Sequence, residues 1–210
     1  NKKEGPILEA KTPPPSIWDK KSIDLARIIN DKWLLKNKYN LQYGYKALEI
    51  YSKMRIFHDK ENNALLDLNL EYLNTESQHQ LRQFLLLNLA LENWHSLDVG
   101  NRKFYIDPLD DTVYPIYYDG GSKFLDNKLD YYLYSDDKNN PYAGYMLDES
   151  YLEDIYILQK QINNLDMGSL ILNLKNRGLA KENLLFLESR FKEVITERLI
   201  ALEKNIFRNY

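Results

Sequence analysis

The chain has 210 residues and carries 28 Lys and Arg against 31 Asp and Glu, a net charge of -3 that gives no electrostatic reason to expect a nucleic-acid partner. It contains no cysteine, which excludes disulfides, cysteine nucleophiles and cysteine-bound zinc. No stretch is apolar over the roughly 18 to 20 residues that a membrane-spanning helix needs, so we expect no membrane span.

Proline dominates the first part of the chain, at Pro6 and in the run Pro13–Pro15. Consecutive prolines favour an extended polyproline conformation and are excluded from a helix interior. We therefore expect residues 1–16 to be an extended linker, or a strap that enters the domain, and residues 17–210 to form a single helix-rich lobe. Because the chain begins with Asn, we interpret it as part of a longer or processed protein.

Apolar residues at helical spacing predict a first helix from an N-cap at Ser22 to Leu34, and a second from Asn40 to Met54. Between residues 56 and 73 the pattern fits either a helix or an extended segment, and that choice stays open.

The strongest helix signal runs from Thr75 to Glu92. Thr75 is predicted to be the N-cap, and Gln78 three residues later completes a capping-box pattern. The segment is apolar nearly all round, so we expect this helix to lie in the centre of the domain.

A β-hairpin is predicted at about residues 102–118. Phe104 and Ile106 alternate with polar residues, as in a half-buried strand, and a turn rich in Pro and Asp follows. A second strand begins at Val113. Residues 126–150 read as a long loop, and three helices are expected at about 149–164, 167–174 and 181–207. The predicted fold class is mainly α with a small β-hairpin (α+β).

Polar residues flank this hairpin. A hairpin brings the loop before its first strand close to the residues after its second strand, so Asp98, Asn101 and Asp119 are expected to converge. Carboxylate and carboxamide oxygens suit Mg²⁺, and phosphoryl transfer depends mainly on metal, charge and positioning. In the alternative reading, Asp98 and Asn101 bond to nearby backbone and Asp119 is part of a turn.

This stretch resembles the spore-coat protein H (CotH) type of atypical, protein-kinase-like domain over about 30 residues. The matching residues are His95-x-Leu97-x-x-x-Asn101-Arg102-Lys103-Phe104-Tyr105-x-Asp107-Pro108 and Pro115-Ile116-Tyr117-Tyr118-Asp119-Gly120. The resemblance implies the C-terminal lobe of a kinase-like fold, with ATP and Mg²⁺ or Mn²⁺ as cofactors and a protein as the phosphate acceptor. It also implies that Asn101 and Asp119 bind the metal.

The chain departs from the kinase pattern in two respects. Kinase-like loops carry a catalytic Asp five residues before the metal-binding Asn, and Ser96 stands there. We therefore expect Asp98 or His95 to position or deprotonate the acceptor hydroxyl. Either Arg102 or Lys103 is expected to contact phosphate, because neighbours in a strand face opposite ways. No glycine-rich loop is present, so the site is expected to be incomplete in this chain.

Two other classes of function stay open. The first is a non-catalytic helical domain for interaction, for example in a surface or scaffold protein. In such a domain Asp98, Asn101 and Asp119 would only form caps and turns. The second is a carboxylate-dependent hydrolase that uses Glu92 and Asp98 as an acid–base pair. An exported or cell-surface location is slightly favoured over a cytoplasmic one, and the sequence leaves the oligomeric state open.

Overall fold

The computed structural model describes residues 4–11, 25–54, 70–93, 96, 101–117 and 147–208. These residues are mainly helical, with a small antiparallel sheet of four strands, and the predicted α+β class is confirmed at that level. The elements in chain order are β1 (Ile7–Lys11), β2 (Leu25–Ile28), α1 (Asp31–Leu34), α2 (Lys38–Met54), η2 (Leu70–Tyr72), α3 (Thr75–Ala90), β3 (Lys103–Ile106), β4 (Val113–Ile116), η5 (Glu149–Tyr151), α5 (Leu152–Asn163), α6 (Met167–Asn176) and α7 (Lys181–Arg208).

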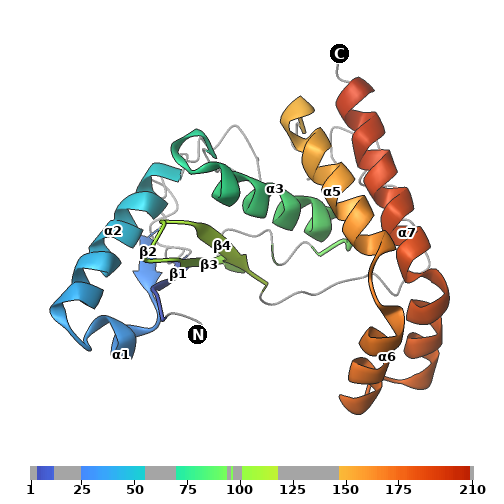
Figure 1. Cartoon of the computed structure of the whole chain (residues 1–210), viewed down its shortest axis with the longest axis horizontal. Helices are drawn as coiled ribbons and strands as arrows, with labels where there is room; N and C mark the ends of the chain where they lie inside the picture. Colours follow the sequence, from blue (N-terminus) through green and yellow to red (C-terminus); the bar gives the residue numbers. More distant parts are fainter. Residues whose placement is uncertain are drawn as a thin grey trace, which may run out of the picture.

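The sheet has the strand order β2-β1-β3-β4, and every neighbouring pair is antiparallel. Leu8 in β1 lies opposite Ile28 on one side and Phe104 on the other, and these side chains contribute to the core. Since side chains alternate along a strand, Glu9 and Lys103 point to the opposite face. Helix α3 lies above the sheet in Figure 1, between α2 and the pair α5 and α7.

The predicted hairpin at about residues 102–118 corresponds to β3 and β4 and is confirmed as a local structure. The sheet is larger than predicted, because β1 and β2 extend it. Residues of the expected N-terminal linker form β1, an inner strand of the sheet. The predicted helix from Ser22 to Leu34 is wrong over β2, and of its described residues, 25–34, only Asp31–Leu34 are helical. Pairing with β1 outweighs the helical spacing of apolar residues there, because short apolar runs fit either period.

The other predicted helices are confirmed, with ends shifted by a few residues. Helix α3 begins at Thr75, but its N-cap is Asn74, whose side-chain oxygen accepts a hydrogen bond from the N–H of Ser77 at 2.8 Å. Most of the stretch expected to be a loop, residues 126–146, lies outside the described residues. So do residues 56–69, whose conformation was left open.

Ser77 fastens the start of α3 to the hairpin. Its hydroxyl donates to Asn74 and accepts from the N–H of Val113 in β4 at 2.8 Å. Ser77 is fully buried. This contact fixes how α3 lies across β4, and therefore where the end of α3 lies relative to the hairpin.

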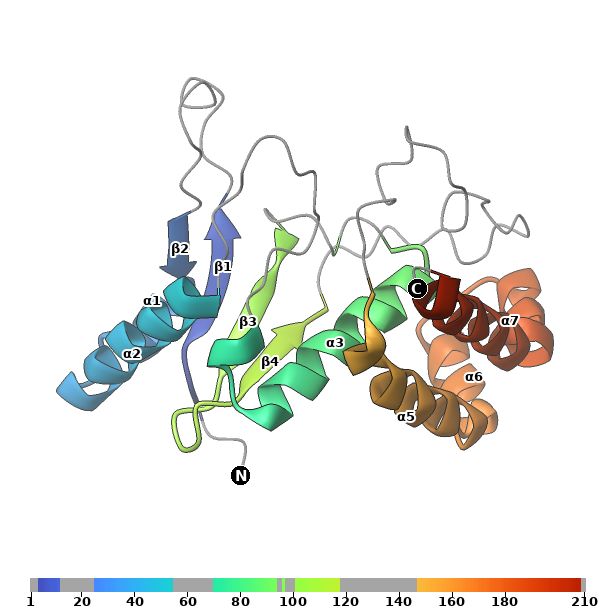
Figure 2. The same cartoon turned by 90° about the horizontal axis from the view of Figure 1, so that it is seen from above.

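Two hydrophobic clusters form the core, and α3 contributes to both. The sheet cluster consists of Leu8, Ala47, Tyr51, Met54, Leu73, Leu81, Phe104, Ile106 and Val113. The helical cluster consists of Leu85, Leu86, Leu89, Ala90, Leu147, Ile155, Leu158, Ile162, Leu187, Ile195, Leu199, Leu202 and Ile206. Figure 2 shows the sheet and the C-terminal helices on either side of α3. The expectation that α3 is central is confirmed.

None of the helices in the described ranges is long and apolar enough to cross a membrane.

Close packing around Gly5 gives a first testable prediction. A Cβ built on Gly5 would lie 2.8 Å from the carbonyl oxygen of Ile106 and 2.7 Å from the ring of Tyr105. We expect Gly5→Ala to lower the free energy of unfolding by about 1–3 kcal/mol, as overpacking does, measured by urea denaturation. Gly168→Ala on the exposed surface of α6 is the control, since its nearest neighbour would lie at 3.4 Å. Equal stability of the two variants would refute the close contact.

Candidate functional site

A buried polar network fixes the chain where α3 ends. The side-chain nitrogen of Asn93 donates to the side-chain oxygen of Asn88 at 2.5 Å and to the hydroxyl of Ser96 at 2.8 Å. Asn88 in turn donates to the carbonyl of Phe84 at 2.7 Å. The three polar residues are at most 1% exposed. Buried amides of this kind stabilise a single conformation when they are hydrogen-bonded, so the network specifies the first part of the segment between α3 and β3.

A buried ion pair holds the same turn from the other side. Glu92 has a φ of 53°, a left-handed conformation that is uncommon outside glycine. Its carboxylate oxygen Oε1 lies 2.9 Å from Nη2 of Arg198 in α7, and both side chains are 2% exposed. Nη1 of Arg198 donates to the carbonyl of Ala90 at 2.7 Å. Arg198 of α7 therefore contacts both the last turn of α3, at Ala90, and Glu92, which follows that helix.

The hairpin register brings the start of β3 and the end of β4 to the same end of the sheet. Lys103 at the start of β3 lies opposite Ile116 at the end of β4 and opposite Glu9 in β1. Asn101 precedes β3 by two residues and is half-buried. The end of β4, at Ile116, therefore lies at the same end of the sheet as Asn101. Asp119 follows Ile116 by three residues in the sequence.

Arg102 and Lys103 occupy different surroundings, and Arg102 is 5% exposed. The side chain of Lys103 lies on the face of the sheet opposite the sheet cluster, where its Nζ is 3.2 Å from Oε1 of Glu9. Arg27 in β2 donates to the other carboxylate oxygen of Glu9 at 2.8 Å. Partial burial acts to raise the pKa of Glu9, but the hydrogen bonds from Arg27 and Lys103 outweigh it and lower that pKa. Two cations thus share one anion.

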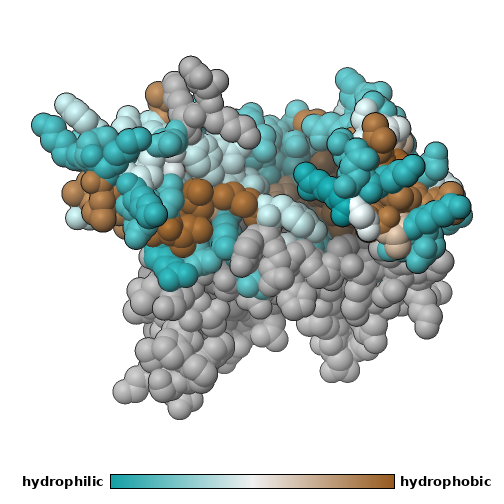
Figure 3. Space-filling model, turned by 90° about the horizontal axis from the view of Figure 1, so that it is seen from below, coloured by the Kyte–Doolittle hydropathy of each residue, from teal (hydrophilic) through white to brown (hydrophobic). Residues whose placement is uncertain are grey.

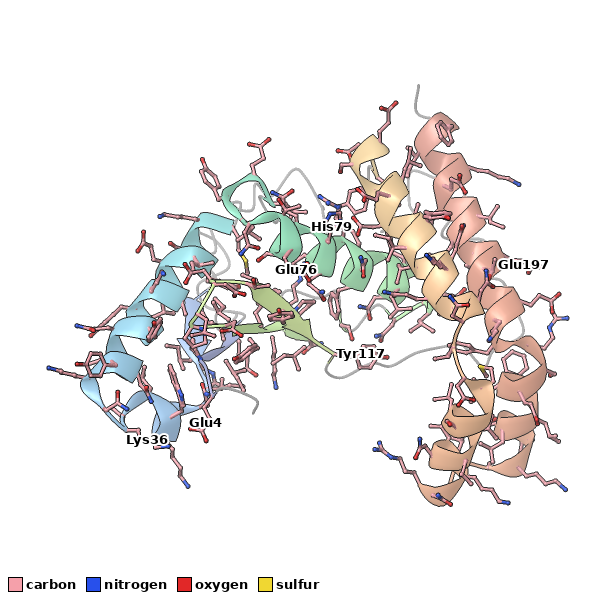
Figure 4. The ribbon with its side chains drawn as sticks, viewed as in Figure 1. Glu4, Lys36, Glu76, His79, Tyr117 and Glu197 are labelled. Carbon is pink, nitrogen blue, oxygen red and sulfur yellow. The ribbon has the colours of Figure 1, made fainter. Side chains whose placement is uncertain are left out.

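A cleft opens on the same face, beyond Tyr105, towards α1. It is lined by Glu4, Gly5, Ile7, Asn30, Lys32, Trp33, Lys36 and Tyr105. The ring of Tyr105 lies 6.1 Å from that of Tyr114, between centroids, and burial raises the pKa of both hydroxyls. Figure 3, seen from below the view of Figure 1, shows hydrophobic residues bordered by hydrophilic ones on this side of the molecule. Glu4 and Lys36 form an ion pair of 3.3 Å at its rim (Figure 4).

A further polar cluster joins α3 to α5. Asp154 is fully buried and accepts hydrogen bonds from Nε of Arg82 at 2.6 Å and from Gln83 at 2.9 Å. Nδ1 of His79 lies 2.9 Å from the same carboxylate, and Figure 4 shows His79 between the two helices. Burial raises the pKa of the nearby Tyr151 to about 12. This cluster lies away from the hairpin edge and ties helices together.

Three of the six residues predicted for the site are described: Asn101, Arg102 and Lys103. His95, Asp98 and Asp119 lie outside the described residues. Within the described ranges, no three His, Cys, Asp or Glu side chains gather in a way that could hold a metal ion.

Sequence reasoning missed Glu9, which contacts Lys103, and Arg27, which contacts Glu9; both are remote in sequence from the motif and are brought near it by strand pairing. It also missed the pairing of Glu92, considered above as an acid, with Arg198. Glu92 is 1% exposed and serves as an ion-pair partner.

No protein-family model, no curated protein and no solved structure matches this chain.

Proposed function

We propose that the chain carries one side of an atypical, kinase-like phosphoryl-transfer site of the CotH type, which binds ATP with Mg²⁺ or Mn²⁺ and transfers phosphate to a protein. The observation that carries the proposal is the order of elements around Asn101. Helix α3 ends in a buried polar turn, and Asn101 lies directly before the β-hairpin. The hairpin ends at Ile116, which pairs with Lys103 near Asn101, and Asp119 follows Ile116 by three residues in the sequence. Protein kinases use a catalytic-loop Asn and a second Asp in this order to bind Mg²⁺.

The residues at this edge suit that chemistry. A carboxamide oxygen from Asn101 and a carboxylate from Asp119 are hard ligands of the kind that Mg²⁺ prefers. Lys103 carries its ammonium group on the sheet face that also holds Arg27 and Glu9, whereas Arg102 is 5% exposed, and an ammonium group can contact a phosphate. Lys103 rather than Arg102 is therefore the candidate for a phosphate contact.

The residue that positions the acceptor hydroxyl is assigned to Asp98 or His95. Ser96 stands where a kinase loop has its catalytic Asp, and its hydroxyl accepts from Asn93 inside the buried network. A serine hydroxyl is a far weaker base than a carboxylate at neutral pH. The proposal thus requires the base to come from a neighbouring position.

The test is calorimetric titration of Mg²⁺–ATP into the wild type and into Asp119→Asn. We expect the variant to bind at least about tenfold more weakly, because it loses a charged metal ligand. Asp166→Asn is the matched control, since Asp166 is an exposed N-cap of α6 and Asn caps a helix equally well. Asn101→Ala, compared with Asn173→Ala on the exposed surface of α6, gives a second matched pair. Equal affinity in the wild type and Asp119→Asn would contradict the proposal.

The alternative is a non-catalytic domain that binds another protein through its helices. Exposed apolar side chains on α6 and α7, at Leu172 (59% exposed) and Leu185 (55% exposed), favour it. Under this alternative, Asn101→Ala and Asp119→Ala lower the melting temperature but leave the response to Mg²⁺–ATP unchanged. The same titration therefore separates the two functions.

A further inference from the structure

The guanidinium of Arg198 in α7 contacts the end of α3 at two places. One nitrogen of its guanidinium faces the carboxylate of Glu92 at 2.9 Å, and another donates to the carbonyl of Ala90 at 2.7 Å. These contacts hold Glu92 in its left-handed conformation, from which the chain turns into the buried network of Asn93 and Ser96.

An ion pair this deeply buried is a poor source of stability. The desolvation of both charges consumes most of their attraction, and apolar residues of similar volume often serve equally well. A left-handed residue that is not glycine adds a further cost, and such costs concentrate where geometry matters for function. We therefore expect the pair of Glu92 and Arg198 to fix the backbone direction at the end of α3, in addition to packing α7 against it.

We propose that Arg198 is a positioning residue for Asn101: through Glu92 and Ala90 it sets the direction in which the chain leaves α3, ahead of the residues that lead to Asn101 in the sequence. This inference rests on the proposed function for its ligand, Mg²⁺–ATP. The link from Arg198 to the chain geometry is independent of any ligand.

The experiment compares Arg198→Met with the double variant Glu92→Met/Arg198→Met, using three measurements. These are the free energy of unfolding in urea, the affinity for Mg²⁺–ATP, and amide hydrogen exchange of the peptide that spans residues 91–102. Arg190→Met is the matched control, since Arg190 lies on the same helix, is half exposed and pairs only locally with Glu193.

Arg198→Met should lose stability, because it leaves Glu92 buried beside an apolar side chain, and the double variant should recover most of it. If Arg198 positions the segment, both variants bind Mg²⁺–ATP about 10- to 100-fold more weakly and exchange faster over residues 91–102. Arg190→Met should match the wild type in all three measurements.

Recovery of affinity and of slow exchange in the double variant would overturn the inference, because it would reduce Arg198 to a structural role. A wild type that does not bind Mg²⁺–ATP would instead contradict the proposed function. In that case the exchange comparison alone decides whether Arg198 sets the geometry of the segment.

Discussion

Replacing Asp154 with alanine is expected to lower the free energy of unfolding by about 3–5 kcal/mol, the range found when one partner of a buried ion pair is removed. Asp154 is fully buried, and Arg82, which donates to it at 2.6 Å, is 8% exposed. Without the carboxylate, the guanidinium stays buried and keeps two long contacts of 3.4 Å, one to Gln78 and one to His79. The loss should exceed that of any single surface substitution.

Urea denaturation measures this effect, and Glu153→Ala serves as the control because Glu153 is the exposed neighbour on the same helix. The control should stay within about 0.5 kcal/mol of the wild type. The double variant Asp154→Leu/Arg82→Met should recover most of the loss, since it removes both charges together. A loss in Asp154→Ala no larger than in Glu153→Ala would show that the cluster does not hold α3 to α5.

Local signals explain which parts of the fold could be predicted. The hairpin of β3 and β4 has alternating residues on both sides of a turn rich in Asp and Pro, so its pattern is complete within a few residues. Strand β1 has no such local partner. Its Leu8 pairs with Phe104, far along the chain, and no local pattern indicates a pairing over that distance. Strand β2 is short, and its apolar residues Leu25, Ala26 and Ile28 also fit the spacing of a helix, so the local pattern alone favours a helix there.

The candidate site likewise contains residues that a local sequence pattern indicates and residues that it does not. Asn101, Arg102 and Lys103 were predicted because they belong to a continuous motif next to the hairpin. Arg198 follows Glu197 on a long helix, where adjacent charges are usually solvated, and it lies 108 residues from the carbonyl that it contacts. Which face of α7 is buried is decided by its packing against α3 and α5, which the sequence of α7 alone does not reveal.

Replacing Phe104 with alanine should also be severe, at about 3–5 kcal/mol, because it opens a cavity in the sheet cluster. Phe104 is 1% exposed, lies opposite Leu8, and has its ring centroid 5.9 Å from that of Tyr51 in α2. Tyr105→Ala is the matched control in the same strand, since Tyr105 faces the partly exposed side of the sheet, and its loss should be smaller.

The Phe104 variant also tests whether α3 makes the two clusters one cooperative unit. Helix α3 places Leu81 in the sheet cluster and Leu85 in the helical cluster, one turn apart. If that link is strong, Phe104→Ala should shift two urea transitions together: the fluorescence of Trp33, with Trp18 and Trp94 replaced by Phe, and the helical circular dichroism. A helical transition that keeps its wild-type midpoint would show that the C-terminal helices unfold separately. Destabilising the sheet would then leave the contacts of Arg198 with Glu92 and Ala90 intact. The β-hairpin and the polar turn after α3 could therefore be perturbed independently.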